Sequence, residues 1–168
     1  QPLPRGNRVA ILTNAGGPAI LAADALEEAG MELAPLTAGT KAFLRPRVFA
    51  AASVENPVDV LAGAGPATYA LCLDALLNDE TVDAVVIIQA PQDWFKPISL
   101  AEVVGEVANS PLGRAKPILT ILMGLASTSE ATQVLHRRRI PNYAFPERVG
   151  STLGAMWRRR QWLDAGPG

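Results

Sequence analysis

The chain has 168 residues, a length typical of one domain. Its net charge of -1 excludes a strongly basic nucleic-acid-binding module and an acidic disordered tail. With one cysteine and one histidine, the chain cannot form an intramolecular disulfide or a metal site that needs several such ligands.

The two ends of the chain indicate how it is organised. No run of about 18 apolar residues is present, so no transmembrane helix is expected. Residues 1–7 lack the apolar stretch and cleavage site of a signal peptide and are interpreted as a linker. We expect a single domain over residues 8–162, a tail over residues 163–168, a longer parent protein and a cytoplasmic location.

Five short apolar runs, bounded by polar residues, glycine or proline, predict buried strands. In chain order they are residues 9–13, 33–36, 82–90, 117–123 and 141–145. The third run is β-branched and almost continuously apolar, as in a parallel strand covered on both faces. Pro35 in the second run indicates an edge strand.

Helical segments alternate with these strands. Pro18 suits a first helical turn, and Gly30 suits the left-handed position after a helix end. The expected helices are residues 19–29, 40–51 with an interruption at Pro46, 66–78, 99–109, 129–138 and 149–162, and residues 53–60 are expected to be a loop.

This alternation predicts a three-layer, doubly wound α/β fold with a five-stranded parallel sheet. We expect the strand order 2-1-3-4-5, because the second strand has the features of an edge. Ligands of such sheets bind at the carboxyl ends of the strands. Five loops with unusual residues would meet there: NAGGP, NPVD, QAPQD, MGLAST and FPER.

The first of these loops predicts an anion site. Asn14, Ala15, Gly16 and Gly17 join a strand directly to a helix start, where glycines let a ligand approach unpaired backbone N–H groups. The helix dipole adds positive partial charge, so a phosphate is the expected ligand. A tight turn that binds nothing is the alternative, and the motif alone does not separate the two. The known phosphate loops GxGxxG and GxxxxGK[ST] are absent.

The combination of TNAGGP, NPVD and FPER, at this spacing, resembles a known family. The chain is similar to the C-terminal, CoA-ligase-type flavodoxin-like domain of NDP-forming acyl-CoA synthetases, the ADP-forming acetyl-CoA synthetase group. It is more distantly similar to the C-terminal domain of the succinyl-CoA synthetase β subunit. The resemblance extends from Gly6 to about Trp157 and implies a flavodoxin-like fold.

The resemblance also implies a reaction and a role. Such enzymes interconvert acyl-CoA, ADP and phosphate with acid, CoA and ATP through an acyl phosphate and a phosphohistidine. Residues 14–17 would face that phosphate. The family's histidine lies in a Ser-His-Thr-Gly-like loop that this chain lacks, and His136 is not expected to replace it.

The chain alone is therefore expected to be inactive and to hold no metal. CoA, ATP or ADP, phosphate and Mg²⁺ are implied for the full enzyme. The expected partners are its phosphohistidine, CoA-binding and ATP-grasp domains and acyl-CoA, with no nucleic acid and no membrane.

Other polar and loop residues could border the site or contact a partner domain. They are Asn56, Asp59, Gln89, Gln92, Met123, Gly124, Glu147 and Arg148. For Asn56 and Asp59 the structural alternative is an Asx-type turn, and for Glu147 it is the helix dipole. The triplets at residues 137–139 and 158–160 are interpreted as solvated helix ends, with CoA or an acidic partner surface as the alternative.

One segment favours a second function. Asp93-Trp94-Phe95 is bulkier than the small polar residues that relatives often carry there. A non-catalytic, acyl-CoA-sensing or regulatory module, in one arrangement fused to an acetyltransferase, is the alternative that this segment suggests. Cys72 is expected to be an inert buried thiol.

Overall fold

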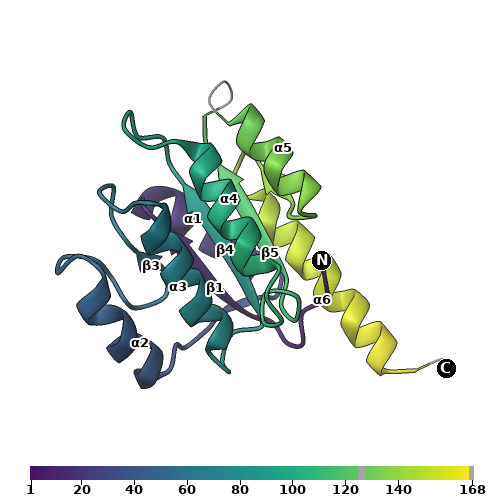
Figure 1. The fold of residues 1–168 in the computed structure, drawn as a ribbon. Coiled ribbons are helices and arrows are strands. Elements are labelled where there is room, and N and C mark those ends of the chain that lie inside the picture. Colours follow the sequence, from purple (N-terminus) through teal and green to yellow (C-terminus); the bar gives the residue numbers. More distant parts are fainter. Residues whose placement is uncertain (125–127, 167–168) are drawn as a thin grey trace.

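Six parallel strands form one sheet between two layers of helices in the computed structural model, which describes residues 1–124 and 128–166 (Figure 1). The strands are β1 (Arg8–Thr13), β2 (Glu32–Leu33), β3 (Val58–Asp59), β4 (Ala84–Gln89), β5 (Ile118–Leu122) and β6 (Asn142–Tyr143). The helices are α1 (Gly16–Glu28), α2 (Ala38–Leu44), the 3-10 helix η1 (Arg45–Arg47), α3 (Pro66–Asn78), α4 (Pro97–Ala108), α5 (Ser129–Arg137) and α6 (Arg148–Asp164).

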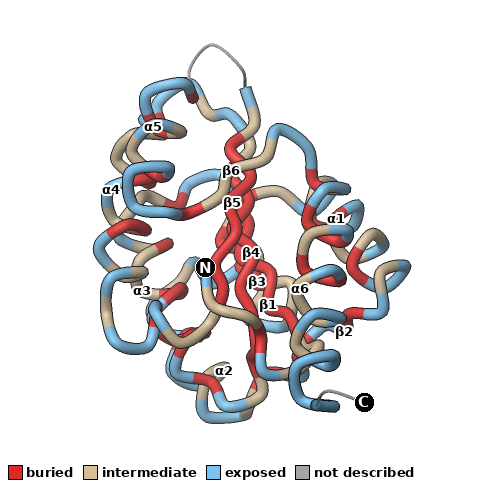
Figure 2. The backbone as a smooth tube through the Cα atoms, turned by 90° about the vertical axis from the view of Figure 1, so that its right-hand side faces the viewer, coloured by how far each residue is buried: buried red, intermediate tan, exposed pale blue. Residues whose placement is uncertain are grey.

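The order of the sheet confirms the sequence prediction for the five expected strands. It runs β2-β1-β4-β5-β6, and every described strand pair is parallel. Figure 2 shows α1 and α6 on one face of the sheet and α3, α4 and α5 on the other. The predicted three-layer, doubly wound arrangement is therefore present.

The sheet has one strand more than predicted, because β3 lies inside the expected loop 53–60. β2 pairs only with the first two residues of β1, while Val58 and Asp59 pair with the last two. Between them, the Asn56 side chain accepts a hydrogen bond from Ile11 N–H at 2.9 Å and donates to Val9 O at 2.8 Å. A side-chain amide thus completes the edge of β1 where no strand lies beside it.

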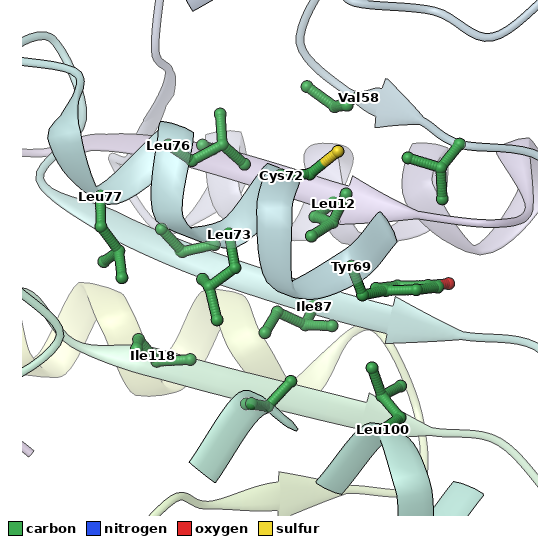
Figure 3. Packing of buried hydrophobic residues seen from close by; sticks show 14 of the residues in the cluster. Leu12, Val58, Tyr69, Cys72, Leu73, Leu76, Leu77, Ile87, Leu100 and Ile118 are labelled. Atoms are coloured by element: carbon green, nitrogen blue, oxygen red, sulfur yellow. The ribbon is translucent and has the colours of Figure 1, made fainter. Parts of the chain in front are cut away.

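Each face of the sheet carries its own apolar cluster, because successive strand residues point to opposite sides. Every residue of β4 is buried. Ile87 packs under α3, whose Tyr69 and Leu73 lie over the sheet (Figure 3). Its neighbour Ile88 packs toward α1 and α6. These two clusters fix α1 and α3 on β1 and β4, and so position the loops at the carboxyl ends of the strands.

Several predicted boundaries are wrong by a few residues. α1 begins at Gly16 rather than at residue 19, and the second strand is only Glu32–Leu33. The predicted helix over 40–51 ends as α helix at Leu44, because Pro46 lacks the N–H that a continued helix requires, and a short 3-10 turn follows. α6 continues to Asp164, into the predicted tail.

The ends of the described chain lie against or beside this body. The Gln1 side chain accepts a hydrogen bond from Ile118 N–H and donates to Arg139 O, each at 2.8 Å. The end of α1 has the predicted glycine motif. Gly30 has φ +81°, and the N–H of Met31 bonds to Leu26 O, which is the C-terminal motif expected for glycine there.

Over residues 1–124 and 128–166, no helix combines the length and apolar character needed to cross a bilayer.

Candidate functional site

The turn from β1 into α1 presents an open helix N-terminus at the carboxyl edge of the sheet. The Thr13 hydroxyl accepts a hydrogen bond from Ala15 N–H at 3.0 Å, and no side chain in the described part of the chain caps α1. Within the described residues, the backbone N–H groups of Gly16 and Gly17 donate no hydrogen bond. Both glycines are exposed, so two donors and the positive end of the helix dipole face solvent.

Neither glycine is required by the backbone. Gly16 and Gly17 are absent from the glycines with positive φ, which are Gly30, Gly124 and Gly166. Among the described residues, a Cβ on Gly17 would meet no atom within 4 Å, and one on Gly16 would meet only Asp59 Oδ2, at 3.8 Å. Since a side chain would fit at both positions, the effect of glycine here is to leave the two N–H groups accessible.

Asn14 does not point into this opening. Its side chain is 6% exposed, and its Oδ1 accepts from Ala90 N–H at 2.8 Å while its Nδ2 donates to Ala90 O at 3.1 Å. The side chain therefore joins the β1–α1 turn to the loop after β4. A phosphate contact for residues 14–17 stays a prediction, and in this arrangement only Gly16 and Gly17 offer free donors.

Asp59 forms the wall of the opening beside Gly16. Its Oδ1 accepts a hydrogen bond from Leu61 N–H at 2.9 Å, which is the Asx turn that the sequence suggested as the structural alternative. Leu61 has φ +67°, a strained conformation for a bulky residue. The Asp59 carboxylate thus lies beside the start of α1, where its charge complements the helix dipole.

Gln89 lies beneath the site rather than in it. It is fully buried, its Nε2 donates to Ala90 O at 2.6 Å, and its Oε1 has no donor among the described residues. Gln92 lies in the following turn, where its carbonyl accepts from Phe95 N–H. Neither side chain is brought to the N-terminus of α1 by a hydrogen bond to it.

The bulky segment after β4 divides into an anchor and an exposed ring. Phe95 is buried and packs edge-to-face on Tyr69, with ring centroids 6.2 Å apart. Trp94 contacts Phe95 but is 56% exposed. Phe95 therefore fixes the loop to the core, while Trp94 presents apolar surface.

Met123 and Gly124 border a second hollow at the same edge. A cavity of about 550 Å³ is lined by them together with Thr128, Thr132, Asn142 and Phe145. Asn142 accepts from Leu122 N–H and donates to the Thr132 hydroxyl, a network with no signal in the local sequence. The remainder of the MGLAST loop, residues 125–127, lies outside the described residues.

Glu147 and Arg148 are exposed at the start of α6. Glu147 lines a groove between α1 and α6 together with Asp24 and Glu28. This places Glu147 along the flank of α1, so an interface role for it stays a prediction. The Arg148 carbonyl accepts hydrogen bonds from the hydroxyls of Ser151 and Thr152.

The remaining reactive groups are remote from the site or buried. His136 is exposed in the last turn of α5. Cys72 is fully buried, and burial raises the pKa of its thiol to about 12, which makes it unreactive at neutral pH. No group of three or more His, Cys, Asp or Glu side chains in the described part of the chain is placed to hold a metal ion.

Comparison with known proteins matches nearly the whole chain. The family model described as "Ligase-CoA domain" matches residues 9–165. The α subunit of acetate–CoA ligase [ADP-forming] II from Pyrococcus furiosus is 34% identical over 168 residues, which is 99% of this chain and 36% of that protein. The 4-hydroxybutyrate–CoA ligase [ADP-forming] from Nitrosopumilus maritimus is 32% identical and matches 100% of this chain and 24% of that protein.

A solved structure matches the fold over its full extent. The dinucleotide-forming acetyl-coenzyme A synthetase 1 of Ca. Korarchaeum cryptofilum, solved in complex with phosphate and ADP, superposes with a TM-score of 0.89. Its sequence is 26% identical, and the match covers 100% of this chain and 37% of that one. The chain therefore spans between about a quarter and somewhat more than a third of the length of these relatives.

Proposed function

Because the chain belongs to the Ligase-CoA domain family, we propose that it is one domain of an NDP-forming acyl-CoA synthetase. The full enzyme would interconvert acyl-CoA, ADP and phosphate with acid, CoA and ATP, and the names of its relatives describe them as ADP-forming acid–CoA ligases. The other domains would supply the phosphohistidine, the CoA site and the ATP-grasp site. We place this reaction in the cytoplasm.

The domain's own contribution would be to hold the phosphoryl group during its transfer. The open N-terminus of α1 carries this proposal, because Gly16 and Gly17 offer two unpaired N–H donors without side chains above them. Such donors are already oriented, so they stabilise developing negative charge without reorganisation. The phosphate in the Ca. Korarchaeum cryptofilum relative makes a phosphate ligand reasonable for the family.

The test compares two substitutions at Gly16 in the full-length protein. Gly16→Pro removes the N–H at the first helical position, which proline favours, and Ala15 before it is already extended (φ −149°, ψ 121°). Gly16→Ala keeps the N–H. We expect Gly16→Pro to lower phosphate-dependent ATP formation about tenfold or more and Gly16→Ala only about threefold, by analogy with loss of one oxyanion donor.

The two variants should have the same unfolding midpoint within a few degrees, which separates a lost donor from a lost fold. If Gly16→Pro forms ATP and the phosphohistidine at the wild-type rate, the phosphate-holding role is wrong although the domain assignment stands.

A second candidate function is favoured by the exposed Trp94 at the site edge. Here the domain would sense acyl-CoA as a regulatory module without catalysis. This candidate would be supported against the synthetase if acyl-CoA binds to the full-length protein and quenches the fluorescence of Trp94, and the protein forms no ATP.

A further inference from the structure

Another cavity lies at the opposite edge of the sheet from the N-terminus of α1. Helices α4 and α5 run back against the strands, so their C-terminal ends lie near the amino ends of β5 and β6. The cavity has a volume of about 560 Å³, within the range of small-molecule sites. Its walls include Gln1, Asn109 and the four arginines Arg114, Arg137, Arg138 and Arg139.

The electrostatics of this cavity are one-sided. None of the described residues that line it is acidic. Among the described residues, none of the four arginine side chains forms a salt bridge or a hydrogen bond. Because the whole chain has a net charge of only -1, this concentration of positive charge is local. Because four arginines line one cavity without a carboxylate among the described lining residues, an anion bound between them would reduce their mutual repulsion.

Two of the four arginines have local contacts that fix their position. The Arg138 stem lies against Gly105 of α4, where a Cβ would be 3.1 Å from Arg138 Cγ. Arg139 has φ +60° directly after α5, a position where glycine is the ordinary residue. Gln1 braces this turn by donating to Arg139 O. Strained backbone that is kept in place by its surroundings is typical of ligand sites.

The helix dipole explains only part of this cluster. It favours a cation in the last turn of α5, which accounts for Arg137. Arg114 lies in the loop after α4, and Arg139 lies beyond the end of α5. The dipole therefore gives no reason for the side chains of these separate segments to line one cavity.

We propose that this cavity binds a small organic ligand that carries two or more phosphate groups. Guanidinium groups bind phosphate through paired N–H donors. A concave site of this size is suited to a small ligand, whereas a protein partner would need a flatter surface. The site does not include the N-terminus of α1, so its test is independent of the test of the proposed function.

The test uses the full-length Gly16→Pro variant, to remove the proposed first phosphate site, and inorganic tripolyphosphate as the probe. Binding is measured by calorimetry, and its location by hydrogen exchange with mass spectrometry. We expect slower exchange in residues 105–116 and 134–140. Arg114→Gln with Arg138→Gln should weaken the affinity about tenfold or more, by loss of two charge-assisted contacts.

The matched control is Arg158→Gln with Arg159→Gln, which removes the same charge from α6. It should change the affinity less than about twofold, because these arginines line a different part of the surface. Equal losses in the two double variants, or no protection of the two segments, overturn the proposal. Protection by a polyglutamate peptide but not by tripolyphosphate also overturns it, in favour of an acidic protein partner.

Discussion

Asn14 and Ala90 are joined by a pair of hydrogen bonds that ties the end of β1 to the end of β4. The Asn14 amide both accepts from the N–H and donates to the carbonyl of Ala90, as a neighbouring strand would. Because the donors of Gly16 and Gly17 follow directly in the chain, this pair fixes where they lie relative to the central strand. The Asn14 side chain therefore positions the candidate phosphate site without having to contact the ligand.

Asn14→Ala should lower the free energy of unfolding by about 2–3 kcal/mol, because it leaves the N–H of Ala90 without a partner near the core. Urea denaturation measures this loss. Asn78→Ala is the control, because that exposed asparagine bonds only within α3 and should cost less than about 0.5 kcal/mol. Equal effects at the two positions would contradict the bracing role of Asn14.

Gly150 of α6 packs directly on α1. A Cβ at Gly150 would overlap the carbonyl oxygen of Ala25, and one at Gly154 would lie 2.9 Å from Ala29 Cβ. The two helices can approach only because both positions lack a side chain. Gly150→Ala should therefore destabilise the domain by about 1–3 kcal/mol through overpacking, although alanine favours helix.

The thermal midpoint of Gly150→Ala tests this, with Gly39→Ala in α2 as the control. A Cβ at Gly39 would meet only Thr37 Oγ1, at 3.9 Å, so this variant should be neutral or slightly more stable. If both variants shift the midpoint upward, α1 and α6 are not in the close contact described.

The sheet could be predicted from sequence because its determinants are local. Neighbouring residues alone identify the apolar β-branched run that forms β4. They also identify the helix boundaries marked by Pro18 and Gly30. β3 could not be predicted, because two residues form a strand only when β1 leaves its edge unpaired. The Asn56 amide that completes that edge bonds to Ile11, 45 residues away.

The location of the candidate site can also be predicted from local sequence, but the contacts of its side chains cannot. The glycines after β1 indicate an accessible helix start from sequence alone. The role of Asn14 could not be read, because an amide serves a ligand and a backbone equally well, and its partner is 76 residues away. The arginine-lined cavity brings together residues of the N-terminus, the loop after α4 and the end of α5, so only the fold makes it visible.

Asp79 is a buried carboxylate that joins the start of α2 to the end of α3. It accepts hydrogen bonds from Thr37 N–H at 2.9 Å and from the Thr81 hydroxyl at 2.7 Å. Burial opposes its charge, but the hydrogen bonds from threonine hydroxyls and backbone N–H groups outweigh burial and hold the pKa of Asp79 well below its usual range. The folded state therefore binds the proton more weakly than the unfolded state.

The contribution of Asp79 to stability is accordingly full above a pH of about 4, the unfolded pKa, and is lost as the pH falls toward the folded pKa. Asp79→Asn replaces one acceptor oxygen by an NH₂ donor that faces the backbone N–H of either Thr37 or Thr81, and should cost about 2–3 kcal/mol at pH 7. This difference from wild type should shrink steadily in urea titrations below pH 4. A difference independent of pH, or one equally large for the exposed Asp24→Asn, would contradict this assignment.

Arg139 combines a backbone conformation that lowers stability with a side chain that lines the proposed anion cavity. Its N–H bonds to His136 O and the N–H of Ile140 bonds to Leu135 O, which is the helix-ending motif that normally has glycine at this position. A left-handed conformation costs a residue with a Cβ about 1–2 kcal/mol. Arg139→Gly should therefore raise the free energy of unfolding, by about 1 kcal/mol after the greater chain entropy of glycine is included.

Arg137→Gly, two residues earlier and inside α5, removes the same charge and should instead cost about 1 kcal/mol. If the two variants change the free energy of unfolding in opposite directions in urea denaturation, backbone conformation rather than charge governs the difference. Loss of stability in Arg139→Gly would mean that the arginine side chain makes a stabilising contact that outweighs its strain. If Arg139→Gly is more stable yet binds tripolyphosphate more weakly, arginine is kept there for the cavity and at the expense of the fold.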